Sequence, residues 1–420
     1  MKLKDFNADV SEGKVENFNV NETSGIGLRI FSGRRIGFGY TTDLSNSAIE
    51  SMISMAEAGS TRVNEDPFNR MPGAAKGEKP IYRDDIYDKT AIKILPEEKV
   101  CFAKAIEQNA LKHDKRIKKV LRASVSTSEY MTAIINSAGL ERSGFGTFSS
   151  VSIEVIAKKG NEIQTGGDFE VKRFYSDINT DSIINNACFR AISLLDARRV
   201  ASQEVPVIFD PLVSCEFLEV IAQGLCADMS QKGKSVFINK IGEEVASPLL
   251  NIIDDGTLLR GTGTFCFDAE GTTSQKTVLI ERGVLKSFLH NDYTAAKSGI
   301  KSTANAVRTF KETPRVGFSN LFIEPGANDR ESLLNVEKGI YVFGVMGIHM
   351  MDPVSGDFSV GVNGLWIENG SYSHAVSGVT MAGNLFNLLN SIDSVASDIK
   401  FYGNIGAPTI RISNLILSGN

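Results

Sequence analysis

Few residues of this 420-residue chain are of the types that bind transition metals or attack a substrate. It has four histidines and five cysteines, and no two cysteines form a CxxC pair. His113 lies in a run of charged residues, while His290 and His374 stand beside turn-like polar stretches, so we expect surface or turn roles for these three. A histidine-rich metal site is therefore not predicted, and the unpaired cysteines favour a reducing compartment over a disulfide framework.

His349 has the most suggestive neighbours of the four histidines. It is preceded by Met346 and followed by Met350 and Met351, and thioether and imidazole groups together suit copper. The alternative is a strand or loop whose methionines fill irregular space or line a groove. We favour that alternative, because no second histidine or cysteine lies nearby in the sequence. His349, Met350 and Met351 are thus candidates for the wall of a peptide groove.

Two further groups could carry chemistry, and simpler interpretations compete with both. Cys215 and Cys226 flank a predicted helical segment about three turns apart, which is too far for one metal, so we expect buried, unreactive thiols. The acidic runs at 254–256 and 268–271 could bind a hard cation. Acidic residues followed by glycine are also common turn chemistry, and turns are the favoured interpretation.

The composition excludes several classes of protein. Apolar residues make up 42% and charged residues 23%, as in an ordinary globular protein, and the net charge is −5. A dedicated nucleic-acid binder would show a basic excess, and no apolar stretch is long enough to span a membrane. The first residues lack the apolar segment of a secretory signal, so we expect a cytoplasmic location. The chain has no phosphate-binding loop, dinucleotide fingerprint, HExxH or GxSxG motif.

The first half of the chain should form an α+β unit with an antiparallel sheet. Apolar residues alternate through 24–42, which predicts a hairpin, and again through 120–174, which predicts a meander. Helical periodicity predicts helices after Ser45 or Ser47, from Pro96, and over 181–199. A polar, proline-rich stretch at 66–94 is interpreted as a linker.

The second half should be mainly β, either barrel-like or sandwich-like, with a few helices. A helical stretch is predicted around 212–228, and glycine-containing turns at 282–283 and 369–370 indicate hairpins. Further helices are predicted to start near Asn328 or Asp329 and near Met381. We therefore expect an N-terminal domain at 1–203, built from about 1–65 and 95–203 around the linker, and a C-terminal domain at 206–420.

A series of spaced motifs in the second half is specific enough to indicate a family. The motifs are GKSV at 233–236, GEEVAS at 242–247, DDGT at 254–257, DAEG at 268–271, VLIERGVL at 278–285, NLFIEPG at 320–326, GDF at 356–358, WIENG at 366–370 and GAPTIR at 406–411. The first half adds GLR at 27–29, RIG at 35–37 and TDLS at 42–45. In order and spacing the chain resembles the TldD/PmbA family, once labelled modulators of DNA gyrase, although a helix that opens the family's fold is expected to be missing.

The resemblance implies a zinc peptidase made of two kinds of subunit. TldD-type members carry an HExxxH helix and a later cysteine ligand, whereas PmbA/TldE-type members lack these ligands. Together they are expected to enclose a chamber in which unfolded peptides are cleaved, in peptide-antibiotic maturation and antitoxin turnover. The charge balance gives no support to the old gyrase label.

The resemblance also places the zinc helix in this chain. The stretch that should read HExxxHGL reads LEVIAQGL at 218–225, so the two histidine positions hold Leu218 and Gln223, and only Glu219 is retained. Leucine has no lone pair, and a neutral amide is a poor zinc ligand. The segment before Pro408 that should hold the cysteine contains none. We therefore expect no metal or cofactor in this chain, and zinc in a TldD-type partner.

Three functions remain in competition. The first is a PmbA/TldE-type subunit without catalytic residues, paired with a TldD-type subunit and acting on unfolded peptides. The second is a homodimeric peptide-binding protein of the same family without a peptidase role. The third is a hydrolase that works without zinc, for example through Cys226 or Glu219, and it ranks last because no set of nucleophile, base and acid is recognisable.

Overall fold

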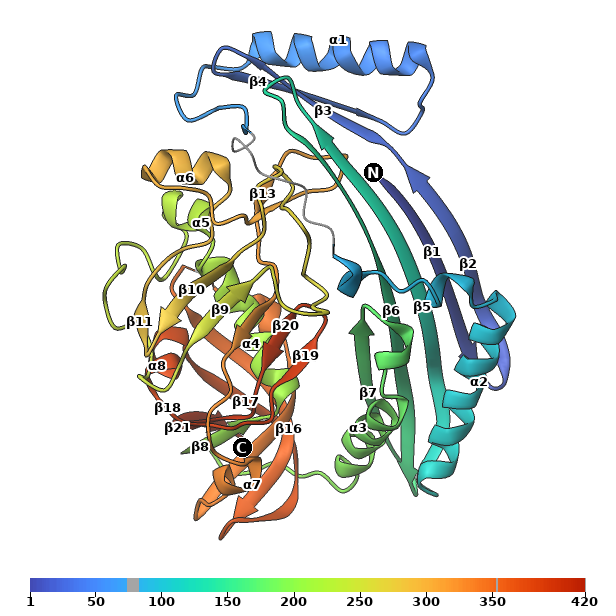
Figure 1. Cartoon of the computed structure of the whole chain (residues 1–420). Helices are drawn as coiled ribbons and strands as arrows, with labels where there is room; N and C mark the ends of the chain where they lie inside the picture. Colours follow the sequence, from blue (N-terminus) through green and yellow to red (C-terminus); the bar gives the residue numbers. More distant parts are fainter. Residues whose placement is uncertain (74–82, 353, 420) are drawn as a thin grey trace.

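The computed structural model describes residues 1–73, 83–352 and 354–419, so residues 74–82 of the predicted linker lie outside the described residues. Long, curved strands form an arc along one side of the molecule, and the C-terminal half fills the space beside that arc (Figure 1). A small layer of one helix on a two-stranded sheet lies at one end of the arc.

The arc is a five-stranded antiparallel sheet in the order β2-β1-β5-β6-β7. The predicted meander supplies three of its strands, and the other two form an N-terminal hairpin that residues 1–23 were not predicted to make. The strands are β1 (Lys2–Ser11), β2 (Lys14–Ser24), β5 (Ile117–Ile135), β6 (Glu141–Lys159) and β7 (Glu162–Lys172).

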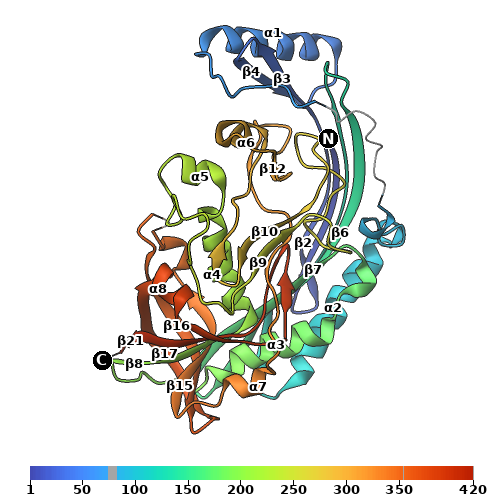
Figure 2. The same ribbon diagram turned by 60° about the vertical axis from the view of Figure 1, so that its left-hand side comes forward.

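Helices α2 (Pro96–His113) and α3 (Thr180–Ser193) cover one face of this sheet (Figure 2). The inward stripe of each helix packs with the alternate apolar residues of the strands, such as Val125 and Val151, in one core. Pro96 starts α2 as predicted, and α3 ends several residues before the predicted limit. Short 3₁₀ turns at Asp84–Ile86, Ala91–Lys93 and Tyr175–Asp177 complete this half of the chain.

The predicted hairpin of 24–42 is present as β3 (Ile26–Ser32) and β4 (Arg35–Thr41), and α1 (Asn46–Arg62) packs on it. Ser45 caps this helix by accepting a hydrogen bond from the backbone of Ala48. The helix approaches the hairpin so closely that a Cβ atom on Gly37 would lie 1.7 Å from the carbonyl oxygen of Ala56. Glycine is therefore required there to let the two backbones touch.

A five-stranded barrel forms the centre of the C-terminal half. Its strands follow the order β17-β16-β15-β8-β21, and pairing between β17 and β21 closes it. The parallel pair β8–β15 is the exception in an otherwise antiparallel barrel. The barrel strands and the attached β18 are β8 (Gln203–Phe209), β15 (Lys338–Met346), β16 (Asp357–Glu368), β17 (Ser371–Asn384), β18 (Ile392–Val395) and β21 (Ile410–Ser418).

A second, mixed sheet and several helices complete the C-terminal half. The strands of this sheet are β9 (Ile252–Asp255), β10 (Lys276–Glu281), β11 (Val284–Leu285), β14 (Leu321–Ile323), β19 (Lys400–Tyr402) and β20 (Ile405–Ala407). The remaining elements are α4 (Pro211–Gly224), α5 (Ala227–Gln231), α6 (Asp292–Ser298), α7 (Arg330–Leu333), α8 (Leu385–Asn390), the 3₁₀ turn Ile348–Met350, and the pair β12 (Ala306–Val307) and β13 (Arg315–Val316).

The fold class is therefore confirmed, and the barrel is the correct one of the two predicted alternatives for the C-terminal half. The helix expected near Met381 is present as α8, but it begins four residues later at Leu385, because Met381 itself lies in β17 and pairs with Leu417 where the barrel closes. The helix near Asn328 is confirmed as α7, which Asp329 caps. No helix among the described residues is long and apolar enough to cross a membrane.

Candidate functional site

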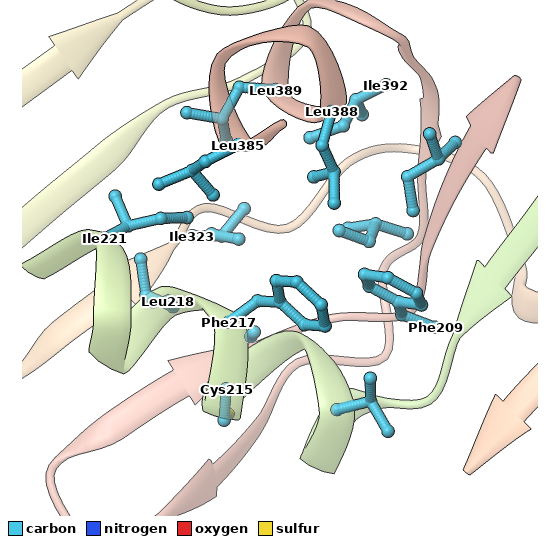
Figure 3. Close-up of a cluster of buried hydrophobic side chains, with 14 of the residues drawn as sticks. Phe209, Cys215, Phe217, Leu218, Ile221, Ile323, Leu385, Leu388, Leu389 and Ile392 are labelled. Atoms are coloured by element: carbon cyan, nitrogen blue, oxygen red, sulfur yellow. The ribbon is translucent and has the colours of Figure 1, made fainter. Parts of the chain in front are cut away.

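Helix α4 contains the three positions that the family resemblance singled out. Asp210 caps it by accepting the backbone N–H of Leu212, and Pro211 occupies the first turn. Its apolar side lies in the main core of the C-terminal half, where Phe217 stacks on Phe209 with ring centroids 4.8 Å apart. Figure 3 shows Leu218 turned into the same cluster of buried side chains. The helix is therefore held by ordinary core packing.

The three zinc-helix positions do not converge on one point. Leu218 is fully buried, whereas Glu219 and Gln223 lie on the exposed side of α4. A zinc ion needs several lone pairs directed at one centre, and here one position is an alkyl group in the core and another is a solvent-facing amide. The residues present therefore do not fit zinc. Within residues 1–73, 83–352 and 354–419, no group of three or more His, Cys, Asp or Glu side chains is arranged to hold a metal.

Glu216 is the unusual residue on the polar side of α4. One of its carboxyl oxygens is buried without a hydrogen-bond partner among the described residues. Burial raises the pKa of Glu216 to about 7, and although Arg190 favours the ionised form, Glu219 and Asp210 add repulsion. Helix α4 thus carries a carboxyl group whose pKa lies near neutral pH, a feature that the sequence did not indicate.

The predicted thiols and histidines are placed as follows. Cys215 and Cys226 are buried, and burial raises the pKa of each thiol to about 12, which makes both poor nucleophiles at neutral pH. His349 and Met350 lie exposed on a turn beside α4, and Met350 is 77% exposed. Met351 packs into the core at 6% exposure, which corrects its assignment to a groove wall.

The two acidic runs take different forms. Asp268 makes the predicted turn, because its carboxylate accepts the backbone N–H groups of Glu270 and Thr272. In the run 254–256 the turn is made by Asp255, whose carboxylate accepts the backbone N–H of Thr257. Asp254 is instead a buried strand residue that accepts hydrogen bonds from Asn305 and Ser319. The sequence could not separate these cases, since the side-chain partners come from segments far along the chain.

Two buried arginines join the sheet to the C-terminal half. The side chain of Arg173 donates to the carbonyl oxygens of Gly261, Thr262 and Thr264, and its guanidinium lies 4.1 Å from the ring centroid of Phe148. Only 1% of Arg173 is exposed. These bonds fix the loop of residues 261–265 against the sheet.

Arg190 of α3 makes the second junction. It donates to the carboxylates of Asp168 and Asp210, at 2.9 and 3.3 Å, and to the hydroxyl of Tyr402. Lys400 also contacts Asp168, at 3.0 Å. Since Asp210 is the cap of α4, this network ties the start of α4 directly to the N-terminal sheet.

The face of the sheet opposite α2 and α3, called here the helix-free face, carries rows of small polar side chains. Strand pairing aligns Asn17, Asp9, Ser124 and Ser152 across four neighbouring strands. Asp9 accepts hydrogen bonds from Asn17 and Ser124 within this row. The next row consists of Asn19, Asn7, Ser126 and Ser150, and the hydroxyl groups of Ser126 and Ser150 form a hydrogen bond. Such a face offers both donors and acceptors at the spacing of extended chains.

Two pockets lie between the helix-free face and the C-terminal half, each of about 410 Å³. The first, called here the Phe pocket, is lined by Phe148 of the sheet and by Phe265, Phe267 and Phe318, with Asp268 among its polar residues. The second, called here the charged pocket, is lined by residues of β5–β7 and α3 and, from the C-terminal half, by residues that include Phe343 and Gly344 of β15; its charged residues are Arg122, Glu154, Asp168 and Arg190.

Sequence reasoning missed both pockets. Their walls combine strands that are more than 90 residues apart in the chain, so no local motif marks them. A signal was nevertheless present in the alternation of serine with apolar residues at 123–128 and 150–155, which specifies a strand with one polar face. The polar face could have been predicted, but not what lies across from it.

Three family models match nearly the whole chain. They are described as the PmbA/TldA metallopeptidase C-terminal domain, central domain and domain 1, and they match residues 202–419, 89–195 and 2–60. Among curated relatives, metalloprotease PmbA of Escherichia coli O157:H7 is 27% identical over 412 residues, covering 97% of this chain and 88% of its own length. A metalloprotease of Methanocaldococcus jannaschii is 29% identical over 406 residues, covering 93% and 87%.

Solved structures agree with these matches. A Thermotoga maritima protein named as a candidate modulator of a DNA gyrase superposes with a TM-score of 0.91 at 26% identity, covering 99% of this chain and 94% of its own. TldE from Thermococcus kodakarensis superposes with a TM-score of 0.87 at 22% identity, covering 100% and 95%. At that identity the second match speaks for the fold alone.

Proposed function

Because this chain belongs to the PmbA/TldD family of metallopeptidases, we propose that it is the PmbA/TldE-type, non-catalytic subunit of a two-subunit zinc peptidase. Its partner is a TldD-type subunit that holds the zinc. The substrates are unfolded peptides, such as peptide-antibiotic precursors and antitoxins, and the assembly works in the cytoplasm.

The observation that carries this proposal is the state of helix α4. Leu218 is buried in the core, and Gln223 faces solvent, so the positions that would bear the histidines cannot direct lone pairs at one ion. Glu219 alone would neither hold zinc nor lower the pKa of a bound water. A family member with these residues needs another chain to supply the metal.

The helix-free face is the second support, because it suits a chain that contacts peptides without cutting them. Rows of asparagine and serine can exchange hydrogen bonds with a peptide backbone, which is the same in every sequence. Sequence-independent contacts of this kind are what a peptidase for unfolded peptides requires. His349 and Met350, exposed beside α4, remain candidates for an additional apolar contact.

Co-expression with an HExxxH-bearing relative from the same genome tests the proposal. We expect a stable heterodimer that contains one zinc ion and cleaves unfolded peptides, while this chain alone does neither. A matched control replaces the histidines of the partner, which should remove zinc and activity but leave the heterodimer intact. Stoichiometric zinc and peptide cleavage by this chain alone would contradict the proposal.

The homodimeric peptide-binding protein remains a second candidate because of strand β2. This strand is the free edge of the five-stranded sheet, and Phe18 and Val20 on it are 49% and 65% exposed. An unpaired edge with exposed apolar side chains can pair with the same strand of a second copy. Self-association that persists when the HExxxH-bearing protein is added would favour this candidate, and exchange into the heterodimer would exclude it.

A further inference from the structure

We propose that the Phe pocket is a subsite for the ammonium end of a lysine side chain in the bound peptide. The inference rests on the proposed function only in taking the ligand to be an unfolded peptide. It assigns a side-chain preference to a surface whose other contacts are with the backbone. The argument uses the walls of the pocket, its free acceptor atoms and its charge.

The walls of the pocket suit an alkyl chain with a cationic end. Phe148 comes from β6, and Phe265, Phe267 and Phe318 come from the C-terminal half, so aromatic rings line the space from both sides of the domain junction. Phe265 is 36% exposed although it lies in the pocket. An alkyl stem would cover that apolar surface, and the negative faces of aromatic rings attract an ammonium group.

Two polar side chains of the pocket, Asp268 and Thr262, keep unused acceptor capacity. The Asp268 carboxylate has about four lone-pair sites. Three of them accept the backbone N–H groups of Glu270, Thr272 and Ala306, which leaves one on the oxygen that bonds Ala306. The hydroxyl oxygen of Thr262 is buried with no hydrogen-bond partner among the described residues. An ammonium group has three N–H donors and no acceptor, which complements such a set.

The charge around the pocket is mixed: the buried guanidinium of Arg173 lies 4.1 Å and 5.2 Å from the ring centroids of Phe148 and Phe265, while the nearby carboxyl groups leave room for a further cation. Glu270 is paired with Arg29 at 2.9 Å, but neither Asp268 nor Asp254 forms an ion pair within the described ranges. Burial raises the pKa of Asp268 to about 7 and that of Asp254 to about 6. A cation bound in the pocket would stabilise the ionised form of Asp268.

A phenylalanine side chain is the alternative occupant. It would fill the same aromatic walls, but it would leave the free lone pair of Asp268 and the hydroxyl of Thr262 without donors. The two occupants therefore make opposite demands on these polar atoms, and this difference can be measured.

The test measures binding of short unfolded peptides to the full chain by fluorescence anisotropy. Each peptide has a labelled, blocked N-terminus and one central residue that is lysine, its uncharged analogue norleucine, or phenylalanine. We expect the lysine peptide to bind about tenfold more tightly than the norleucine peptide. Equal affinities, a preference for phenylalanine, or no binding of any peptide would overturn the proposal.

Three variants assign the preference to this pocket. Thr262→Val keeps the shape of the side chain and removes a hydroxyl that has no partner, so it should fold normally and reduce the lysine preference. Phe265→Ala should reduce it further, and Asp268→Asn should abolish it if the variant folds. Phe145→Ala is the matched control, because Phe145 is 39% exposed on the same strand as Phe148 but does not line the pocket. A lysine preference that survives in both Thr262→Val and Phe265→Ala would contradict the proposal.

Failure of the subsite and failure of the proposed function are distinguishable. A chain that forms the zinc-containing heterodimer but binds all three peptides equally keeps the proposed function and loses the subsite. A chain that prefers lysine through Thr262 and Phe265 but never joins an HExxxH-bearing partner keeps the subsite and points to the homodimeric binding protein.

Discussion

Helix α4 and the acceptor side chains of the Phe pocket belong to the same half of the chain, yet their polar atoms differ in what surrounds them. In α4 the position where a zinc ligand is expected is filled by core packing at Leu218, and Glu219 and Gln223 face only solvent. In the Phe pocket, acceptor atoms of Asp268 and Thr262 are enclosed and have capacity left for a ligand. The comparison indicates that unused hydrogen-bonding capacity lies at the junction of the two halves rather than on α4, where the family resemblance implies the zinc ligands.

Removing Arg173, which fixes the loop of residues 261–265 against the sheet, should have the largest effect on stability. Arg173→Ala would leave the carbonyl groups of Gly261, Thr262 and Thr264 without their donor and would open a cavity beside Phe148. We expect the free energy of unfolding to fall by about 4 kcal/mol in denaturant titrations. Arg70→Ala is the control, since the exposed Arg70–Asp292 pair should contribute less than about 1 kcal/mol. Similar losses of unfolding free energy for both variants would show that Arg173 stabilises the junction no more than an exposed ion pair does.

Introducing histidines into α4 tests whether this helix can bind zinc, the other half of the comparison. Leu218→His would bury a polar ring in the core and should destabilise the protein by about 3 kcal/mol, whereas Gln223→His on the exposed side should change stability by less than about 0.5 kcal/mol. The double variant should not bind zinc tightly in a competition assay with a chelator. Tight zinc binding without loss of stability would mean that α4 is not inert.

Glu216→Gln should produce a smaller effect that depends on pH. Burial raises the pKa of Glu216 from about 4.5 to about 7, so between these values the folded state keeps a proton that the unfolded state releases. The stability of the native chain should therefore fall as pH rises through this window, and this loss should be absent in the variant. We expect Glu216→Gln to be more stable by about 1 to 3 kcal/mol at pH 8 and similar to the native chain at pH 4. A constant difference across that range would contradict the assignment.

Glu219→Gln should have the smallest effect. Glu219 is exposed, and its hydrogen-bonding capacity is met by water, so the free energy of unfolding should change by less than about 0.5 kcal/mol. Peptide cleavage by the proposed heterodimer should also be unchanged, because the proposal assigns the zinc to the partner. A large loss of cleavage with normal heterodimer formation would revive the hypothesis that this glutamate takes part in the chemistry.

The sequence allowed much of the fold to be predicted, because most of the information was local. Alternating residues specified the meander of β5–β7, and Pro96 and Asp329 marked the starts of two helices. The start of the helix predicted near Met381 was misplaced because a strand that closes a barrel is stabilised by its partner, here through the pairing of Met381 with Leu417, and the helix begins only at Leu385. The hairpin of β1 and β2 was missed for a related reason, since asparagine-rich β2 is held by pairing with β1 rather than by its own propensity.

By itself the sequence determined the family motifs, the alternation that builds a sheet with one polar face, and the presence of Leu218 and Gln223 where the family resemblance implies histidines. Those facts depend on residue type and spacing alone. Only the tertiary structure decided that Leu218 is enclosed in the core, that Glu216 is partly withdrawn from water, and that Asp268 and Thr262 share a pocket with phenylalanines from both halves. Burial and the free lone pairs of a side chain depend on what packs against it, and here that packing comes from segments far away in the chain.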